Sequence, residues 1–109
     1  MANTFKLKTK ANVGVTTVGI YTAPASTTTV VIGITLANTS GSGVNVGVGI
    51  TRAGTTEDVK LLKNAPIPQG SSLEFMGGNK VVLESTDTVT VYSDTNNSID
   101  ASLTIMEIT

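Results

Sequence analysis

Few residues of this chain have the types and spacing that catalysis requires. The sequence contains no histidine and no cysteine, which excludes Ser-His-Asp and Cys-His nucleophiles, histidine-ligated metals and disulfide bonds. Of its eight acidic residues, Glu84 and Asp87 are close in sequence and leave a paired-carboxylate hydrolase as an alternative. Acidic residues at strand ends and turns more often face water. We therefore expect a protein that is not an enzyme and has no catalytic residue.

The acidic turn from Asp94 to Asp100 has the outline of a calcium loop but lacks two of its essential residues. Ile99 stands at the sixth position, where the loop needs glycine, and Ile105 stands at the twelfth, where it needs a bidentate acid. No Gly-x-x-x-x-Gly-Lys phosphate loop and no βαβ pattern for a dinucleotide is present. The sequence predicts no metal site and no cofactor.

Alternating threonines at Thr86, Thr88 and Thr90 line one face of a predicted strand. Such a hydroxyl row can order water and suggests ice binding, although an exposed strand face is often built this way. A glycan-binding face favours exposed aromatic rings, and this chain has no Trp, two Tyr and two Phe. An adhesive or ligand-binding β-module, with ice or glycan as its ligand, is thus the alternative function of a different class.

The composition indicates one all-β domain that assembles with other proteins. The chain has 109 residues, 39% hydrophobic and only 14% charged, so we expect a single domain over residues 1–109. Its net charge of −1 argues against nucleic acid or an anionic membrane as partner. No signal peptide or membrane-spanning apolar run is visible, and synthesis in a cytoplasm is expected.

Short alternating apolar runs at intervals of 8–12 residues predict about eight strands and no amphipathic helix. This spacing predicts an antiparallel β-sandwich, jelly-roll-like or Ig-like, with a closed barrel as the alternative. Turns are expected at residues 52–56 and 77–79. The expected strands cover residues 4–10, 13–22, 27–36, 44–51, 58–63, 72–76, 80–84, 88–92 and 99–108.

A hairpin from Thr27 to Ile50 is the strongest local prediction. Pairing Leu36 with Val44 places two apolar rows opposite each other, because paired residues share a face. These rows are Val30, Ile32, Ile34 and Leu36 on one strand, and Val44, Val46, Val48 and Ile50 on the other. The opposite face is small and nearly flat, and is our candidate interface: Val31, Gly33, Thr35, Asn45, Gly47 and Gly49. A last hairpin should set Val91 on Ile99 or Ala101.

The first strand adds a charged row to this candidate interface. Phe5 and Leu7 are expected to face the core, which leaves Lys6, Lys8 and Lys10 outside. A lysine row can protect a sheet edge from aggregation, or it can contact an acidic neighbour in an assembly.

Three stretches carry a family resemblance over nearly the whole chain: residues 13–48, residues 64–91 and residues 98–108. Their motifs are the Leu-Ala-Asn at 36–38, the Pro-x-x-x-Gly-Ser-Ser at 66–72 and the Lys-Val-Val-Leu-Glu at 80–84. In this plan the chain resembles small β-rich structural proteins of tailed bacteriophage virions. The resemblance includes no catalytic motif.

The resemblance implies a virion component that assembles in the host cytoplasm. A head decoration or cement protein is the leading expectation, and a neck, tail or fibre-attachment component is the alternative. The implied partners are the major capsid protein or neck and tail proteins, together with further copies of the chain, since such proteins act through area and symmetry.

Overall fold

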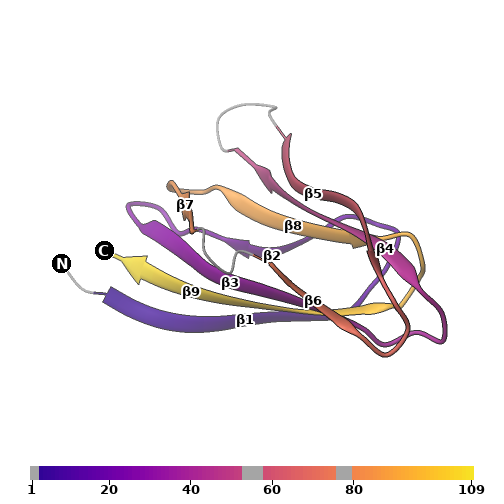
Figure 1. The fold of residues 1–109 in the computed structure, drawn as a ribbon. Helices are drawn as coiled ribbons and strands as arrows, with labels where there is room; N and C mark the ends of the chain where they lie inside the picture. Colours follow the sequence, from indigo (N-terminus) through magenta and orange to yellow (C-terminus); the bar gives the residue numbers. More distant parts are fainter. Residues whose placement is uncertain (1–2, 53–57, 76–79) are drawn as a thin grey trace.

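The computed structural model describes residues 3–52, 58–75 and 80–109 and confirms the all-β, antiparallel sandwich (Figure 1). Most of the two predicted turns at 52–56 and 77–79 lies outside the described residues. In the described part of the chain, no helix is long and apolar enough to cross a membrane. The strands are β1 (Asn3–Val13), β2 (Val18–Thr22), β3 (Thr28–Asn38), β4 (Val44–Thr51), β5 (Asp58–Ile67), β6 (Ser72–Phe75), β7 (Val81–Leu83), β8 (Thr88–Ser93) and β9 (Ile99–Ile108).

These strands pair as one long hairpin that has been rolled up. Along this hairpin the antiparallel pairs are β4 with β5, β3 with β6 and β7, β2 with β8, and β1 with β9. Rolling also places β9 beside β3 and β8 beside β4. Sheet A therefore has the order β1-β9-β3-β6, with β7 also on β3, and sheet B has the order β2-β8-β4-β5. This arrangement is a jelly roll, and across the described residues the two sheets do not close into a barrel.

The predicted hairpin between Thr27 and Ile50 is wrong in its pairing. Both strands form, but β3 lies in sheet A and β4 lies in sheet B, so Leu36 and Val44 are not partners. The predicted last hairpin is wrong for the same reason, since β8 belongs to sheet B and β9 to sheet A. Alternation of side chains identifies the buried face of a strand, but it does not identify the sheet to which the strand belongs.

The buried side chain of Asn38 holds the crossing from β3 to β4. Its amide nitrogen donates to the carbonyls of Ser42 at 2.8 Å and Ile67 at 3.0 Å. Its oxygen accepts hydrogen bonds from the Ser40 backbone nitrogen at 2.9 Å and the Ser40 hydroxyl at 2.7 Å. One side chain thus satisfies several backbone groups where the chain leaves one sheet for the other.

Two of the expected strands differ clearly from the observed ones in their extent. The predicted strand at 13–22 is divided, because Val13 ends β1 while β2 begins at Val18. β5 continues through Pro66 to Ile67, which is possible because β5 is an edge strand of sheet B.

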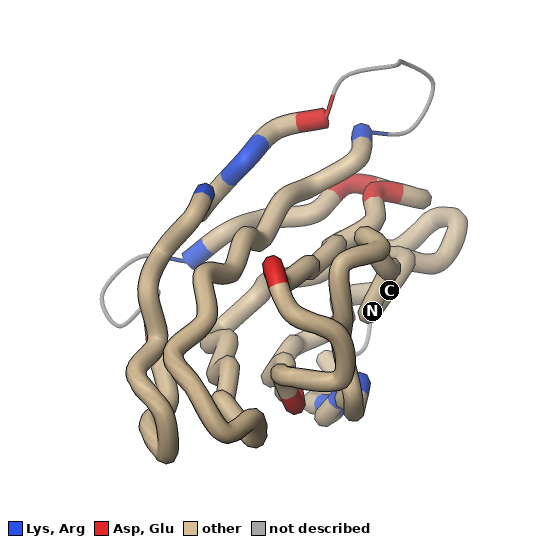
Figure 2. The backbone as a smooth tube through the Cα atoms, turned by 90° about the vertical axis from the view of Figure 1, so that its right-hand side faces the viewer, with Lys and Arg blue, Asp and Glu red and all other residues tan. Residues whose placement is uncertain are grey.

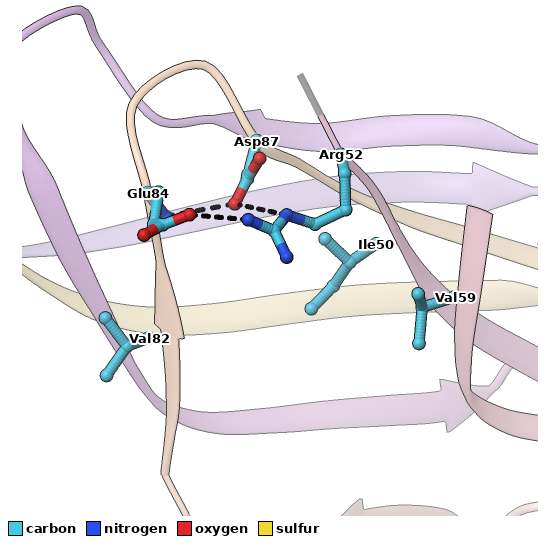
Figure 3. A pocket seen from close by; sticks show the side chains of 6 residues that line it. All are labelled: Ile50, Arg52, Val59, Val82, Glu84 and Asp87. Carbon is cyan, nitrogen blue, oxygen red and sulfur yellow. Dashed lines mark hydrogen bonds and ion pairs between the residues drawn. The ribbon is translucent and has the colours of Figure 1, made fainter. Parts of the chain in front are cut away.

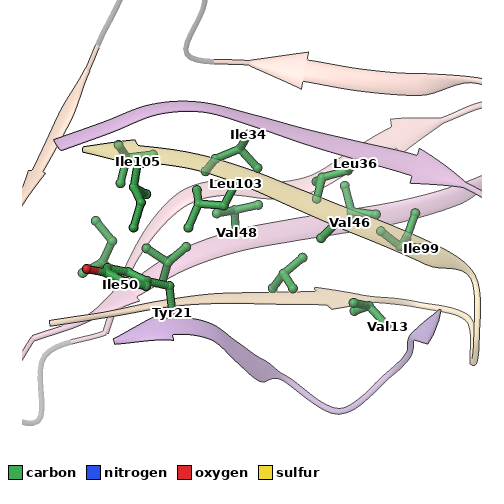
Figure 4. Packing of buried hydrophobic residues seen from close by; sticks show 14 of the residues in the cluster. Val13, Tyr21, Ile34, Leu36, Val46, Val48, Ile50, Ile99, Leu103 and Ile105 are labelled. Carbon is green, nitrogen blue, oxygen red and sulfur yellow. The ribbon is translucent and has the colours of Figure 1, made fainter. Parts of the chain in front are cut away.

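The inner faces of the two sheets form one aliphatic core, drawn in part in Figure 4. The predicted inward row of β4, from Val44 to Ile50, is buried as expected. The row of β3 is only half correct, because a bulge between Val31 and Gly33 changes the parity of the strand. Val31, Ile34 and Leu36 are buried, whereas Val30 and Ile32 are only partly buried.

Candidate contact surface

The six residues predicted to share one flat face are separated by the fold. Val31 is a core residue with 1% exposure. Gly33 and Thr35 lie on the outer side of sheet A, while Asn45, Gly47 and Gly49 lie in sheet B. This separation follows directly from the placement of β3 and β4 in different sheets. Whether any of these residues contacts another protein stays a prediction.

Two of these glycines already accommodate groups of their own chain. A Cβ atom on Gly47 would overlap the ring of Tyr92, and one on Gly49 would lie 2.9 Å from the carbonyl oxygen of Val59. The ammonium of Lys60 lies 5.4 Å from the centre of the Tyr92 ring, a cation–π contact. Both glycines are buried, so close packing within the domain explains why they are small.

The lysine row of β1 faces the opposite way from the prediction. Lys6, Lys8 and Lys10 pair with buried residues of β9, namely Ile105, Leu103 and Ala101. Since paired residues share a face, the lysines lie on the inner side of sheet A, at its edge. Inward-pointing charge on an edge strand is a known protection against strand addition. Figure 2 shows how small a part of the backbone carries charge.

A buried polar group explains this orientation. Glu107 lies on the inner face of β9, and its Oε1 atom is 2.8 Å from the Lys6 ammonium. The Tyr21 hydroxyl donates to Oε2 of Glu107 at 2.6 Å and lies 2.8 Å from the Thr29 hydroxyl. The hydrogen bonds from Lys6 and Tyr21 lower the pKa of Glu107, while burial and the same carboxylate raise the pKa of Tyr21 to about 12. This network joins β1, β3 and β9 of sheet A to β2 of sheet B.

Replacing Glu107 by glutamine should make the protein less stable at neutral pH, by on the order of 1–3 kcal/mol, since partly buried donors lose a charged acceptor. The folded pKa of Glu107 is below its ordinary value of 4.5. Its contribution is therefore complete above that value and is lost as the pH falls through the folded pKa. Urea titrations at a series of pH values should show the two proteins converging in acid.

Glu74→Gln is the matched control, because Glu74 is an exposed acid on β6 of the same sheet. Its urea midpoint should follow the wild-type curve at every pH. Equal pH dependence for wild type and Glu107→Gln would contradict the role given to the Glu107 carboxylate.

The carboxylate pair singled out as a hydrolase alternative is engaged by Arg52 (Figure 3). Arg52 Nη2 lies 2.5 Å from Glu84 Oε1, and Arg52 Nε lies 3.1 Å from Asp87 Oδ2. Asp87 Oδ2 also accepts the backbone N–H of Glu84 at 3.0 Å. The three charged groups line a cavity of about 340 Å³ together with Ile50, Val59 and Val82. Because one guanidinium contacts both acids, the arrangement is that of an ion-pair network that closes the turn between β7 and β8.

Two acidic side chains of the calcium-like turn accept backbone N–H groups of neighbouring strands. Asp94 Oδ1 accepts the N–H of Asn45 at 3.2 Å, and Asp100 Oδ1 accepts the N–H of Asn12 at 3.0 Å. Among the described residues, no group of three or more acidic, histidine or cysteine side chains is placed to hold a metal ion.

The threonine row is shorter than expected. Thr86 precedes β8 and has a φ of 66°, outside the extended region. Thr88 continues across the sheet instead, since it pairs with Thr22 on β2 and Thr51 on β4. Gly19 and Gly49 flank Thr90 on those strands, so the hydroxyl array covers little area. Ice binding stays a prediction without further support.

The outer face of sheet A carries an apolar area that the sequence interpretation missed. Phe5 is 68% and Leu7 65% exposed. The register sets Phe5 beside Met106, Met106 beside Val30 and Val30 beside Val82, so one apolar row crosses four strands. We call this end of the face the apolar half. Exposed apolar side chains gathered in this way usually mark a contact surface.

The other end of the same face is hollow. Mostly small residues, together with Lys10 and Asp100, line a depression of about 330 Å³. We call this end the hollow half, and its outer-face residues are Thr9, Ala11, Thr35, Ala37, Asp100 and Ser102. One sheet face therefore carries both raised and recessed regions.

A signal for this arrangement was present in the sequence at Glu107. It falls in the same alternating row as Ile99, Leu103 and Ile105, and a buried carboxylate needs a cationic partner. Nearby lysines on β1 must then face inward, which turns Phe5 and Leu7 outward.

Solved structures share this fold at low sequence identity. A chain from the acid-stable capsid of the Helicobacter pylori bacteriophage KHP30 superposes with a TM-score of 0.58 at 11% identity, covering 98% of this chain and 87% of that one. A chain from the capsid asymmetric unit of cyanophage Pam1 gives 0.53 at 14% identity, covering 96% and 84%.

A chain from the disulfide-linked pili of Bacillus endospore appendages gives a TM-score of 0.57 at 18% identity, covering 99% of this chain and 87% of that one. No protein-family model matches the chain, and no curated protein matches its sequence. The likeness to the solved structures establishes the fold.

Proposed function

We propose that this chain is a non-enzymatic structural protein of a virion, assembled in the host cytoplasm, and that it acts there as a head decoration or cement protein. The observation that carries the proposal is the jelly roll itself, shared over 96–98% of the chain with chains from two phage capsid structures. Those chains are covered to 84–87% by this one, so they are of similar size.

The surface chemistry supports the same role. The acidic residues considered as catalytic or calcium-binding candidates take part in ion pairs or hydrogen bonds within the chain. Glu84 and Asp87 form ion pairs with Arg52, and Asp94 accepts a backbone N–H. The exposed apolar and hollow halves of sheet A offer area for contact with further copies of the chain, one of the partners expected for such a protein. A protein of this kind binds through many weak, repeated contacts with the major capsid protein.

Quantitative mass spectrometry of purified particles tests this role. In particles of the virus that encodes the chain, we expect its copy number to be of the same order as that of the major shell protein. When heads and tails are separated, the chain should be found in the head fraction. Absence of the chain from purified particles would contradict the proposed role in the virion.

A neck, tail or fibre-attachment component is the second candidate, favoured by the likeness to a chain of a pilus. The same measurement separates the two. A neck or tail component should be present at a small fraction of the shell copy number and should sediment with tails.

A further inference from the structure

We propose that the outer face of sheet A binds a second copy of this chain, with a two-fold axis that lies in the interface and crosses the strands near Thr104 and Gly33. In this arrangement the apolar half of each copy covers the hollow half of the other. The contact is independent of the virion role, since it concerns the protein alone.

The register supplies the self-complementarity. Leu7, Thr104 and Gly33 form the middle row of the face, because Leu7 pairs with Thr104 and Thr104 with Gly33. Phe5 and Thr9 lie two residues to either side, each about 7 Å along the strand. A two-fold rotation about the middle row therefore places the large Phe5 row over the small Thr9 row, and the reverse contact follows from symmetry.

The raised and recessed regions of the face are consistent with this arrangement, in which the apolar half of one copy covers the hollow half of the other. The apolar half presents the exposed ring of Phe5 beside the partly buried Met106, and Leu7 is exposed in the adjoining middle row. The hollow half presents a depression lined by Thr, Ala and Ser residues, with Lys10 and Asp100 also in its lining. The middle row is low at Gly33, where an added Cβ would meet nothing within 4 Å, so two sheets can approach closely there.

The area of the face is of the order that a dimer interface needs. β1, β3 and β9 run for 10 or 11 residues each, and β6 and β7 add 4 and 3 residues in the fourth strand position. At roughly 4.8 Å between strands and 3.3 Å per residue, these strands give a flat footprint of about 600 Å². Side chains rising from a sheet increase the accessible area above that footprint. A standard interface buries roughly 800 Å² per partner.

Charge does not oppose the contact. Among the described positions that the register assigns to this face, Glu74 and Asp100 are charged, and both lie toward the hollow end. Asp100 accepts the N–H of Asn12 and lies in the end row, where the rim of the contact would stay wet. The centre of the face is therefore free of like-charge repulsion between two copies.

Sedimentation of the full chain and its variants tests the proposal. The wild type should sediment at twice 11.2 kDa. Gly33→Leu should fill the middle row without disturbing the fold, and Leu7→Lys should place like charges on the axis. Both should lose the dimer and still unfold in one cooperative transition, lowered only by the stabilisation that the dimer contact gives the wild type. Gly41→Leu and Val15→Lys are the matched controls, since Gly41 also lies in open space and Val15 is 56% exposed; both should remain dimers.

Cross-linking locates the axis, because the chain has no cysteine of its own. A short bis-maleimide should join two copies of Thr104→Cys and should not join Thr22→Cys, which lies on sheet B. A monomeric wild type, a dimer that survives Gly33→Leu, or cross-linking through Thr22 would each overturn the proposal. These measurements need no virus particle, and the particle measurement needs no dimer, so the two proposals fail separately.

Discussion

Replacement of Ile34 by aspartate is expected to abolish folding at neutral pH. Ile34 is 1% exposed and pairs with the fully buried Leu103 in the middle of sheet A. A carboxylate among these aliphatic neighbours loses its hydration, at a cost of several kcal/mol, and the lost isoleucine leaves a cavity. A domain of this size has roughly 5–15 kcal/mol of total stability. Urea titration of the purified variant should show no cooperative transition.

Ile32→Asp is the sharpest control for this prediction. Simple alternation places Ile32 in the same row as Ile34, but the bulge after Val31 takes Ile32 out of the core. The Ile32 variant should fold, with a loss of about 1–2 kcal/mol, because its side chain is partly exposed. If both variants fold or both unfold, the bulge does not separate the two positions.

The amphipathic alternation was enough to predict the fold class. Turn residues separate short β-rich runs, and the absence of a helical period leaves a sandwich or barrel as the compact solution. The inward row of β4 and the closing strand β9 follow from the same pattern. These features depend on local periodicity, which a single sequence carries directly.

Strand pairing could not be predicted in the same way. The expected hairpin matched Leu36 with Val44, and its apolar rows were consistent with that register. In the rolled hairpin, however, the β4 row and Ile34 and Leu36 of β3 meet across the core from opposite sheets. Both arrangements bury these side chains. The choice depends on long-range partners, such as β9 beside β3, and on the hydrogen bond that Asn38 donates to the carbonyl of Ile67.

The prediction of which β1 side chains face the core is wrong for a related reason. An alternating Lys and apolar strand has two faces, and the apolar one is normally inside. Here the inward acid Glu107 reverses the choice, because Lys6 compensates its charge. The contact surface on sheet A was missed as a consequence, since Phe5 and Leu7 had been assigned to the core. A long-range ion pair outweighed the local pattern.

Replacement of Gly47 by valine is expected to destabilise the domain by about 1–3 kcal/mol, the usual range for overpacking. The Cβ atom would overlap the Tyr92 ring, with the Tyr92 hydroxyl oxygen at 2.6 Å. Gly47 pairs with Tyr92 in sheet B, so the ring must rotate away and lose its contact with Lys60. The flat-face interpretation predicts the opposite result, a stable monomer with impaired assembly.

A double-mutant cycle with Tyr92→Ala decides between these outcomes. Removing the ring should abolish most of the cost of Gly47→Val, since the clash is with that side chain alone among the three nearest atoms. Gly41→Val is the matched control, because an added Cβ at Gly41 also meets nothing within 4 Å and Gly41 lies outside the face proposed for the dimer contact. Equal urea midpoints for Gly47→Val and Gly41→Val would contradict internal packing as the reason for Gly47, and the outer face of sheet B would again be a candidate for contact with a neighbour.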